Sequence, residues 1–283
     1  MLIFAAKSKK MKIKFAGIYI VLLLFLSCGE YNKILKEEDA EIRFQYAKQY
    51  FEQGKFSRSA TLLEDVVRVA RGTTMGEEAL YLLAQSYYNM KDYATSSTYF
   101  KSYNSIYPRG EYAELAHYYS AYGLYLNSPD ARLDQTDTYS AMQQFQDYLE
   151  LYPQSERKDE VQNALFELQE KLALKELISV RLYYNLGDYL IYPFPGGNYL
   201  SCVITAESAM HAYPFSKYRE DFMYYMFQAK YEMAIQSVNE KKESRYREVV
   251  DEFHAYSNEY PEGKYMKEIK KRYQNIEEEM KNE

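Results

Sequence analysis

A four-residue pattern, Tyr-Pro followed by any residue and then Gly or Ser, recurs four times in this chain. The copies occupy residues 107–110, 152–155, 213–216 and 260–263. Pro cannot continue a helix, because it lacks the backbone N–H and its ring clashes with the preceding turn. Each copy therefore predicts the end of one helix and the start of the next. An aromatic or small residue lies about eight positions before each Pro, at Phe100, Phe145, Ala206 and Phe253.

The segments that precede these turns also resemble one another. Residues 77–88 align with 114–125 at an offset of 37, with 220–231 at an offset of 143, and with 40–51 at 37 residues in the other direction. Apolar residues recur at spacings of three and four with Glu, Lys and Gln between them, which indicates amphipathic helices. Helix pairs that repeat on this scale are typical of tetratricopeptide-type solenoids, in which each pair buries its apolar face only against its neighbours.

We therefore predict an all-α, tetratricopeptide-like helical solenoid of about five helix pairs plus a C-terminal capping helix. Two of the five pairs carry insertions, at residues 126–137 and, after a long first helix at 156–189, at residues 191–197. Residues 38–153 would hold repeats 1–3, and residues 154–283 would hold repeats 4–5 and the capping helix. The predicted pairs lie at 38–71, 75–108, 111–153, 156–214 and 217–261, and the capping helix at 264–281.

The N-terminal segment has the features of an export signal. Lys12 and Lys14 precede an apolar run at 15–26, and the small residue Ser27 precedes Cys28. The run is short for a membrane span, although an anchor that is never cut is the alternative. Residues 25–28, Phe-Leu-Ser-Cys, resemble a bacterial lipobox.

This motif predicts that residues 1–27 are a lipoprotein signal peptide, that Cys28 carries lipid, and that residues 28–37 form a short tether. Met1 and Met11 are alternative starts. Several acyl chains on Cys28 would hold the protein stably on a membrane.

Charge argues against a nucleic-acid-binding protein, and cysteine content argues against a protein held together by disulfides. Five lysines and no acid lie in residues 1–27, so the 35 basic and 41 acidic residues leave a net charge of −11 once that segment is removed. Nucleic acid is therefore not expected as a partner, because phosphate binding needs a clustered basic face. Cys202 has no disulfide partner once Cys28 carries lipid, and its apolar helical surroundings predict an unreactive thiol.

The lipobox, the five repeats and the Tyr-Pro turns together resemble the BamD family, the outer-membrane lipoproteins of the β-barrel assembly machinery. Residues 133–138, Leu-Asp-Gln-Thr-Asp-Thr, and residues 217–221, Lys-Tyr-Arg-Glu-Asp, add to the likeness, which covers nearly all of 28–261. The loop at 191–197 departs from the compact turn expected there.

The resemblance implies a periplasmic scaffold, anchored by the lipid on Cys28 to the inner leaflet of the outer membrane. Such a scaffold docks on the barrel-forming component and receives unfolded outer-membrane proteins. Gly29 after the cysteine implies transfer to the outer membrane, by resemblance to other bacterial lipoproteins.

Catalysis finds little support in the sequence. His117, His211 and His254 lie in different predicted units and have no partner four residues away, whereas zinc takes three or four ligands. We therefore expect no enzyme activity, catalytic residue, metal or cofactor. Two other functions remain as alternatives, an envelope adaptor that links division or peptidoglycan machinery to the outer membrane, and an accessory protein of an enzyme or a hydrolase on a helical solenoid.

The first helix of each pair lines the concave groove of tetratricopeptide stacks, so its groove-facing residues are candidates for peptide binding. Spacings of four and three place each trio on one helical face. Tyrosines would supply rigid apolar area and glutamine amides would bond an extended backbone, as suits a strand with alternating aromatic residues. Packing alone is the alternative for each ring. The candidates are Phe44, Lys48, Phe51, Tyr81, Gln85, Tyr88, Tyr118, Tyr122, Tyr125, Tyr224, Gln228 and Tyr231. The neighbouring stripe at Leu80, Leu83, Ala84 and Tyr87 is predicted to form the core.

Overall fold

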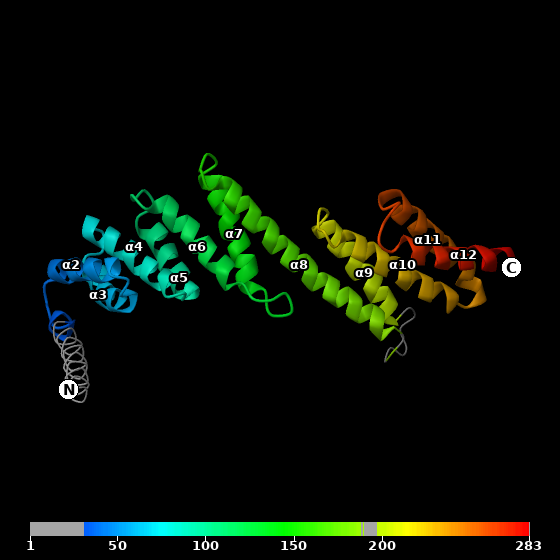
Figure 1. Ribbon diagram of the computed structural model, residues 1–283, viewed down its shortest axis with the longest axis horizontal. Coiled ribbons are helices and arrows are strands. Elements are labelled where there is room, and N and C mark those ends of the chain that lie inside the picture. Colours follow the sequence, from blue (N-terminus) through cyan, green and yellow to red (C-terminus); the bar gives the residue numbers. More distant parts are fainter. Residues whose placement is uncertain (1–30, 188, 190–196, 283) are drawn as a thin grey trace, which may run out of the picture. The chain divides into compact units, whose positions relative to one another are not determined.

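A computed structural model of the chain describes residues 31–187, 189 and 197–282, and the regular elements in these ranges are helices (Figure 1). The predicted signal peptide, Cys28 and most of the insertion at 191–197 lie outside the described residues. The helices follow one another as five pairs and a terminal helix, which confirms the predicted fold. The pairs are α2 (Ala40–Glu52) with α3 (Phe56–Val69), α4 (Thr74–Asn89) with α5 (Tyr93–Ile106), α6 (Ala113–Asn127) with α7 (Thr136–Leu151), α8 (Lys158–Leu186) with α9 (Gly197–Ala212), and α10 (Arg219–Ile235) with α11 (Asn239–Glu259), followed by α12 (Met266–Asn282).

Contacts between Cα atoms divide the chain into two compact units. The first unit is Met1–Asn127 with Gln143–Pro153, and the second unit is Ser128–Met142 with Gln154–Glu283. Within the first unit each helix from α2 to α6 packs on the next, and within the second unit the same holds from α8 to α12. Packing between consecutive helices is what repeat proteins use in place of a central core. The predicted division into domains at residues 153 and 154 stays a prediction.

The first two pairs contain the same turn, 37 residues apart. Gly54 has φ +72° and Lys91 has φ +64°, so both end the first helix of their pair in the left-handed conformation. Ser59 and Ser96 begin the second helices, and each donates its buried hydroxyl to a carbonyl of the preceding helix, at 2.8 and 3.0 Å. The sequence offset of 37 therefore corresponds to a repeat of backbone geometry.

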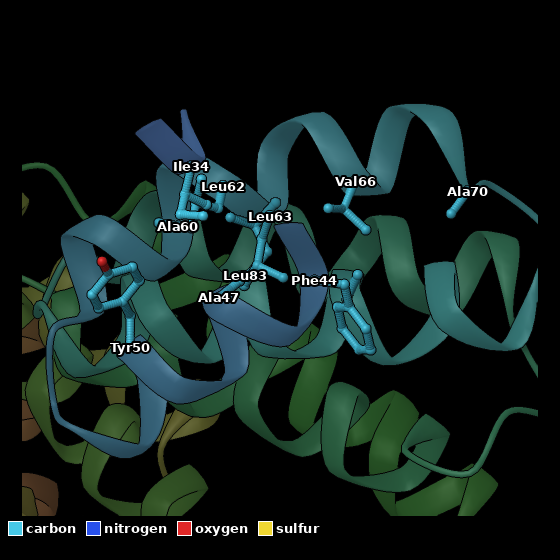
Figure 2. Packing of buried hydrophobic residues seen from close by; sticks show 11 residues of the cluster. Ile34, Phe44, Ala47, Tyr50, Ala60, Leu62, Leu63, Val66, Ala70 and Leu83 are labelled. Carbon is cyan, nitrogen blue, oxygen red and sulfur yellow. The ribbon is translucent and has the colours of Figure 1, made fainter. Parts of the chain in front are cut away.

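The core of the first unit begins between α2, α3 and α4. Leu63 and Val66 of α3 are fully buried, and Phe44 of α2 and Leu83 of α4 belong to the same cluster (Figure 2). Full burial of one such side chain stabilises the fold by roughly 1.5–3 kcal/mol. The predicted core stripe of α4 is confirmed, because Leu80, Leu83 and Ala84 are buried while Tyr87 is partly buried.

A polar turn folds the insertion that precedes α7. The Gln135 side chain is buried, donates from Nε2 to the Asp130 carbonyl at 2.8 Å and accepts from the Thr138 hydroxyl at 2.7 Å. Asp134 Oδ1 accepts from the Thr136 N–H at 2.9 Å. Hydrogen bonds from the Thr136 side chain first, and from its N–H second, hold the pKa of the Asp134 carboxyl below its ordinary value. The segment at 133–138 therefore caps α7 at its N-terminus.

Over residues 31–187 and 197–282, no helix combines the length and the apolarity that crossing a bilayer requires.

Candidate functional site

The second pair ends in a hydrogen-bonded arrangement centred on Glu77, which begins α4. Glu77 Oε1 accepts from the Tyr103 hydroxyl at 2.6 Å and from the Glu111 N–H at 2.7 Å. The Tyr103 hydroxyl in turn accepts from the Tyr112 N–H at 3.1 Å. The Tyr112 ring stacks on Tyr81 with 4.2 Å between ring centroids. We call this arrangement the closure of a pair: a first-helix Glu, a second-helix Tyr, and a stacked tyrosine pair at the turn.

The fifth pair repeats the closure with almost the same distances. Glu220 Oε1 accepts from the Tyr256 hydroxyl at 2.6 Å and from the Lys264 N–H at 2.7 Å. The Tyr256 hydroxyl accepts from the Tyr265 N–H at 3.2 Å, and the Tyr265 ring stacks on Tyr224 with 3.9 Å between centroids. The third pair keeps the central bond, from the Tyr148 hydroxyl to Glu114 Oε1 at 2.9 Å.

The glycine of the Tyr-Pro turn is explained by this closure. A Cβ on Gly263 would lie 2.5 Å from the Tyr256 hydroxyl and 2.6 Å from Glu220 Oε1, and a Cβ on Gly110 would meet the equivalent atoms of the second pair. Neither position has room for a side chain while the closure is intact. The second-helix tyrosines were missed by sequence analysis, although a Tyr four residues before Tyr-Pro was a visible signal. They are Tyr103, Tyr148 and Tyr256.

Burial and the adjacent carboxylates keep the closure hydroxyls protonated. Burial first, and the hydrogen bond to Glu77 second, raise the pKa of Tyr103 well above its ordinary value, and Glu220 acts in the same way on Tyr256. Both hydroxyls therefore remain donors throughout the physiological pH range. The closures are structural, and the carboxylates at the starts of α4 and α10 serve the turn as well as the helix dipole.

Several candidate groove residues of α2 and α4 are buried or bonded to neighbouring side chains. Phe44 is buried, and Lys48 pairs with Glu78 at 2.6 Å, an interaction that raises the pKa of Lys48. Gln85 Nε2 donates to the Tyr81 hydroxyl at 3.1 Å. Five candidates on these helices are half-buried, so part of each side chain faces solvent; they are Lys48, Phe51, Tyr81, Gln85 and Tyr88.

The tyrosines of α6 form a continuous row. Tyr118 stacks on Tyr122 with 5.3 Å between centroids, and Tyr122 contacts Tyr125 at the same distance. Tyr118 is buried, and its ring packs edge-on against Tyr148 of α7. Tyr122 and Tyr125 are half-buried and contact Phe145 of the same unit. The row thus contains one core residue and two half-buried rings.

In the second unit, the candidate residues of α10 contact the terminal helix. Glu268 of α12 accepts from the Tyr224 hydroxyl at 3.0 Å and from Gln228 Nε2 at 2.9 Å. Arg272 of α12 lies over the Tyr231 ring, 4.7 Å from its centroid. Gln228 is fully buried, whereas Tyr224 and Tyr231 are half-buried. Whether any of these trios binds a peptide stays a prediction.

A buried carboxylate links three parts of the second unit. Asp221 of α10 accepts from Lys264 Nζ and from the Tyr265 hydroxyl, both at 2.7 Å, and Arg181 of α8 lies 3.4 Å away. Burial raises the pKa of the Asp221 carboxyl, but the two hydrogen bonds and the two cations outweigh it, so the net pKa is below the ordinary value. Asp221 therefore stays ionised and holds the turn after α11 against α10.

No group of three or more His, Cys, Asp or Glu side chains in the described part of the chain could hold a metal ion. Cys202 is buried, and burial raises the pKa of its thiol to about 12, so the predicted unreactive thiol agrees with the structure. His117 is half-buried beside Tyr152, and burial lowers its pKa.

Comparison with known proteins relates the chain to one family. A family model described as YfiO, outer membrane lipoprotein, matches residues 36–192. No curated protein matches the sequence. Two crystal structures of nearly identical TPR-like repeats, from a Podosopora anserina chain described as a kinesin light chain, have 12% and 13% identity and a TM-score of 0.32. They cover 79% and 80% of this chain and 96% and 100% of their own. A TM-score this low does not establish a shared fold, so the fold assignment is based on the helix pairs described above.

Proposed function

Because this chain belongs to the YfiO family of outer membrane lipoproteins, we propose that it is a non-catalytic scaffold of the β-barrel assembly machinery. The lipid on Cys28 would anchor it to the periplasmic face of the outer membrane. It would dock on the barrel-forming component and receive unfolded outer-membrane proteins before insertion. The family membership is the single observation that carries this proposal.

Half-buried tyrosines of the first unit support the receiving role. Tyr88 of α4 and Tyr122 and Tyr125 of α6 are half-buried, and Tyr88 contacts Tyr119 of α6 with 5.0 Å between centroids. Rings fixed by aromatic neighbours offer apolar area at little cost in conformational entropy. A strand with alternating aromatic residues would place every second side chain on such a surface.

Peptide binding is tested on a variant in which Tyr88, Tyr122 and Tyr125 are all changed to Ser. The probe is a synthetic peptide of about ten residues, the length of one barrel strand, with Phe or Tyr at alternating positions. Fluorescence anisotropy of the labelled peptide should show a loss of affinity of at least about tenfold, because each ring contributes on the order of 1 kcal/mol.

Two controls separate binding from packing. The matched variant Tyr87→Ser changes a half-buried tyrosine on the other stripe of α4, where its hydroxyl donates to Glu64, and it should leave peptide affinity unchanged. A peptide of the same composition with its aromatic residues adjacent should bind more weakly. Equal affinity of the triple variant and the unchanged protein would remove these tyrosines from the receiving surface.

Docking and anchoring have separate tests. The tagged protein, purified from gently solubilised envelopes, should bring with it a large outer-membrane barrel with periplasmic domains in near one-to-one amount. Recovery of division or peptidoglycan proteins in its place would favour the envelope-adaptor alternative. Cys28→Ala should move the protein from the membrane to the soluble fraction, and membrane retention would contradict the lipid anchor.

A further inference from the structure

The fourth pair carries an incomplete closure. The Lys217 N–H donates to Glu170 Oε1 at 3.2 Å, as the Glu111 and Lys264 N–H groups donate to the closure glutamates of the second and fifth pairs. Glu170 of α8 is therefore the closure glutamate of this pair. It is only 7% exposed.

Two tyrosines of the complete closure are replaced in the fourth pair. Ala209 stands four residues before Tyr213-Pro, the position of Tyr103 and Tyr256 in the other pairs, and supplies no hydroxyl. Leu174 stands four residues after Glu170, where the complete closures have the tyrosine that stacks at the turn. Glu170 Oε2 is also buried and receives no hydrogen bond. The Tyr218 N–H donates to Ser216 Oγ at 3.2 Å, in place of a tyrosine hydroxyl.

A pocket of about 410 Å³ opens beside this incomplete closure, entirely within the second unit. Glu170 and Tyr218, which the fourth pair shares with the complete closures, line the pocket together with Leu174, which stands in place of a tyrosine. Such a volume lies within the range of ordinary ligand pockets, roughly 300–1,000 Å³. The remaining lining residues are Asp130, Ala131, Phe166, Glu167, Lys171 and Lys217.

The charges around the pocket favour a cation. Three carboxylates line it, but only two ammonium groups, and Lys171 donates its Nζ to the Ser128 carbonyl and hydroxyl. Lys217 Nζ lies 3.9 Å from Glu170 Oε2, beyond hydrogen-bond distance, and its side chain is two-thirds exposed. The same Nζ lies 5.0 Å from the centroid of the Tyr218 ring. A buried carboxylate oxygen without a donor costs free energy that a well-placed cationic donor would recover.

We propose that this pocket binds an arginine side chain of a partner protein, with the guanidinium on Glu170 Oε2 and its plane against Tyr218. A guanidinium supplies both features that the missing tyrosines supply elsewhere, a hydrogen-bond donor and a flat group that stacks. It would displace Lys217, whose compact ammonium cannot bond a carboxylate in the bidentate manner of arginine. The arginine site would give the scaffold a further way to bind a partner. The proposal does not depend on the scaffold role, because a free arginine derivative is enough to test it.

The experiment uses methyl NMR of the full chain with labelled Ala and Leu methyl groups. Ala131 and Leu174 report on the pocket from two sides, and the probe is Nα-acetyl-argininamide. We expect saturable shifts at both methyls, and binding at least about tenfold weaker for the acetyl amides of lysine and of citrulline, which lack the fork or the charge. Absence of a saturable shift, or equal affinity for the citrulline derivative, would overturn the proposal.

Three variants change the affinity in specified directions. Glu170→Gln keeps an oxygen that can accept the Lys217 N–H but removes the charge, and it should weaken arginine binding about tenfold. Leu174→Tyr rebuilds the stacked pair and should block the pocket in a folded protein, which keeps the test decisive if the first variant is unstable. Lys217→Ala removes the competing cation and should tighten binding about twofold to threefold. Weaker binding by Lys217→Ala, or unchanged binding by the other two, would contradict the assignment.

Discussion

The fourth and fifth pairs use the same Tyr-Pro turn but complete it differently. In the fifth pair Glu220 accepts two hydrogen bonds through one oxygen and a pair of stacked tyrosines covers the turn. In the fourth pair Glu170 accepts one backbone N–H and borders a pocket. The backbone bond from the turn to the glutamate is therefore the common element, while the tyrosines add stability where they are present and leave a pocket where they are absent.

The largest expected effect is the loss of the fifth closure. Tyr256→Ala removes a fully buried ring and the donor to Glu220, so the free energy of unfolding should fall by about 3–5 kcal/mol. Urea unfolding monitored by circular dichroism measures this change. Tyr256→Phe is the matched control and should lose about 1–2 kcal/mol, because it keeps the ring and removes only the hydroxyl. Equal losses for both variants would show that packing of the ring is not what the closure contributes.

The next largest loss of stability is expected at the residue that follows the closure glutamate. This residue is Asp221 in the fifth pair and Lys171 in the fourth. Asp221→Asn should lower the free energy of unfolding at pH 7 by about 2–3 kcal/mol, because it removes charged hydrogen bonds. The pKa of Asp221 is depressed from 3.8 in the folded state. Its stabilisation is thus present above that value and is lost as the pH falls through the folded-state pKa.

The difference in unfolding free energy between the unchanged protein and Asp221→Asn should therefore shrink as the pH falls from 7 to below 4. Unfolding in urea across that pH range measures it. A difference that stays constant would contradict the ionised state assigned to Asp221.

A smaller effect is expected at the turn glycine. Gly263→Ala places a Cβ against the Tyr256 hydroxyl and Glu220, so the free energy of unfolding should fall by about 1–2 kcal/mol. The corresponding change in the fourth pair is Ser216→Ala, which keeps a Cβ and should lose only about 0.5–1 kcal/mol, the bond to the Tyr218 N–H. Thermal unfolding of the two variants compares them, and a larger loss for Ser216→Ala would reverse the comparison.

The smallest effect is a gain. Leu174→Tyr would restore in the fourth pair the stack seen between Tyr224 and Tyr265 in the fifth. An aromatic pair contributes about 0.5–1.5 kcal/mol beyond its buried area, so the melting temperature should rise slightly. A clear fall would show that the pocket lacks room for the ring.

The sequence was sufficient to predict the helix pairs, because Pro ends helices locally and the offset of 37 is visible without any tertiary contact. The core stripe at Leu80, Leu83 and Ala84 also followed from helical spacing. The closures were not predicted. The Tyr four residues before Tyr-Pro is visible in the sequence, but its partner Glu77 is 26 residues away from Tyr103 and no local pattern links the two. The pocket was not predicted either, because its lining residues come from three segments that are far apart in the sequence.

For the candidate groove, the sequence predicted the helical face but not the burial of each residue on it. Helical spacing placed each trio on one face, but it could not tell which members are covered by a neighbouring helix. Phe44, Tyr118 and Gln228 are buried, whereas the other aromatic candidates keep part of their surface exposed. Burial by a neighbour depends on how helices pack, which a single-helix pattern does not contain.

The proposed role in outer-membrane protein assembly is tested most directly by depleting the protein from growing cells. The measured quantity is the folded amount of several β-barrel proteins in the outer membrane, read from their heat-modifiable mobility in gels. The account predicts that folded barrels decline together while lipoproteins that lack a barrel reach the outer membrane normally. Undiminished folded barrels in fully depleted cells would contradict it.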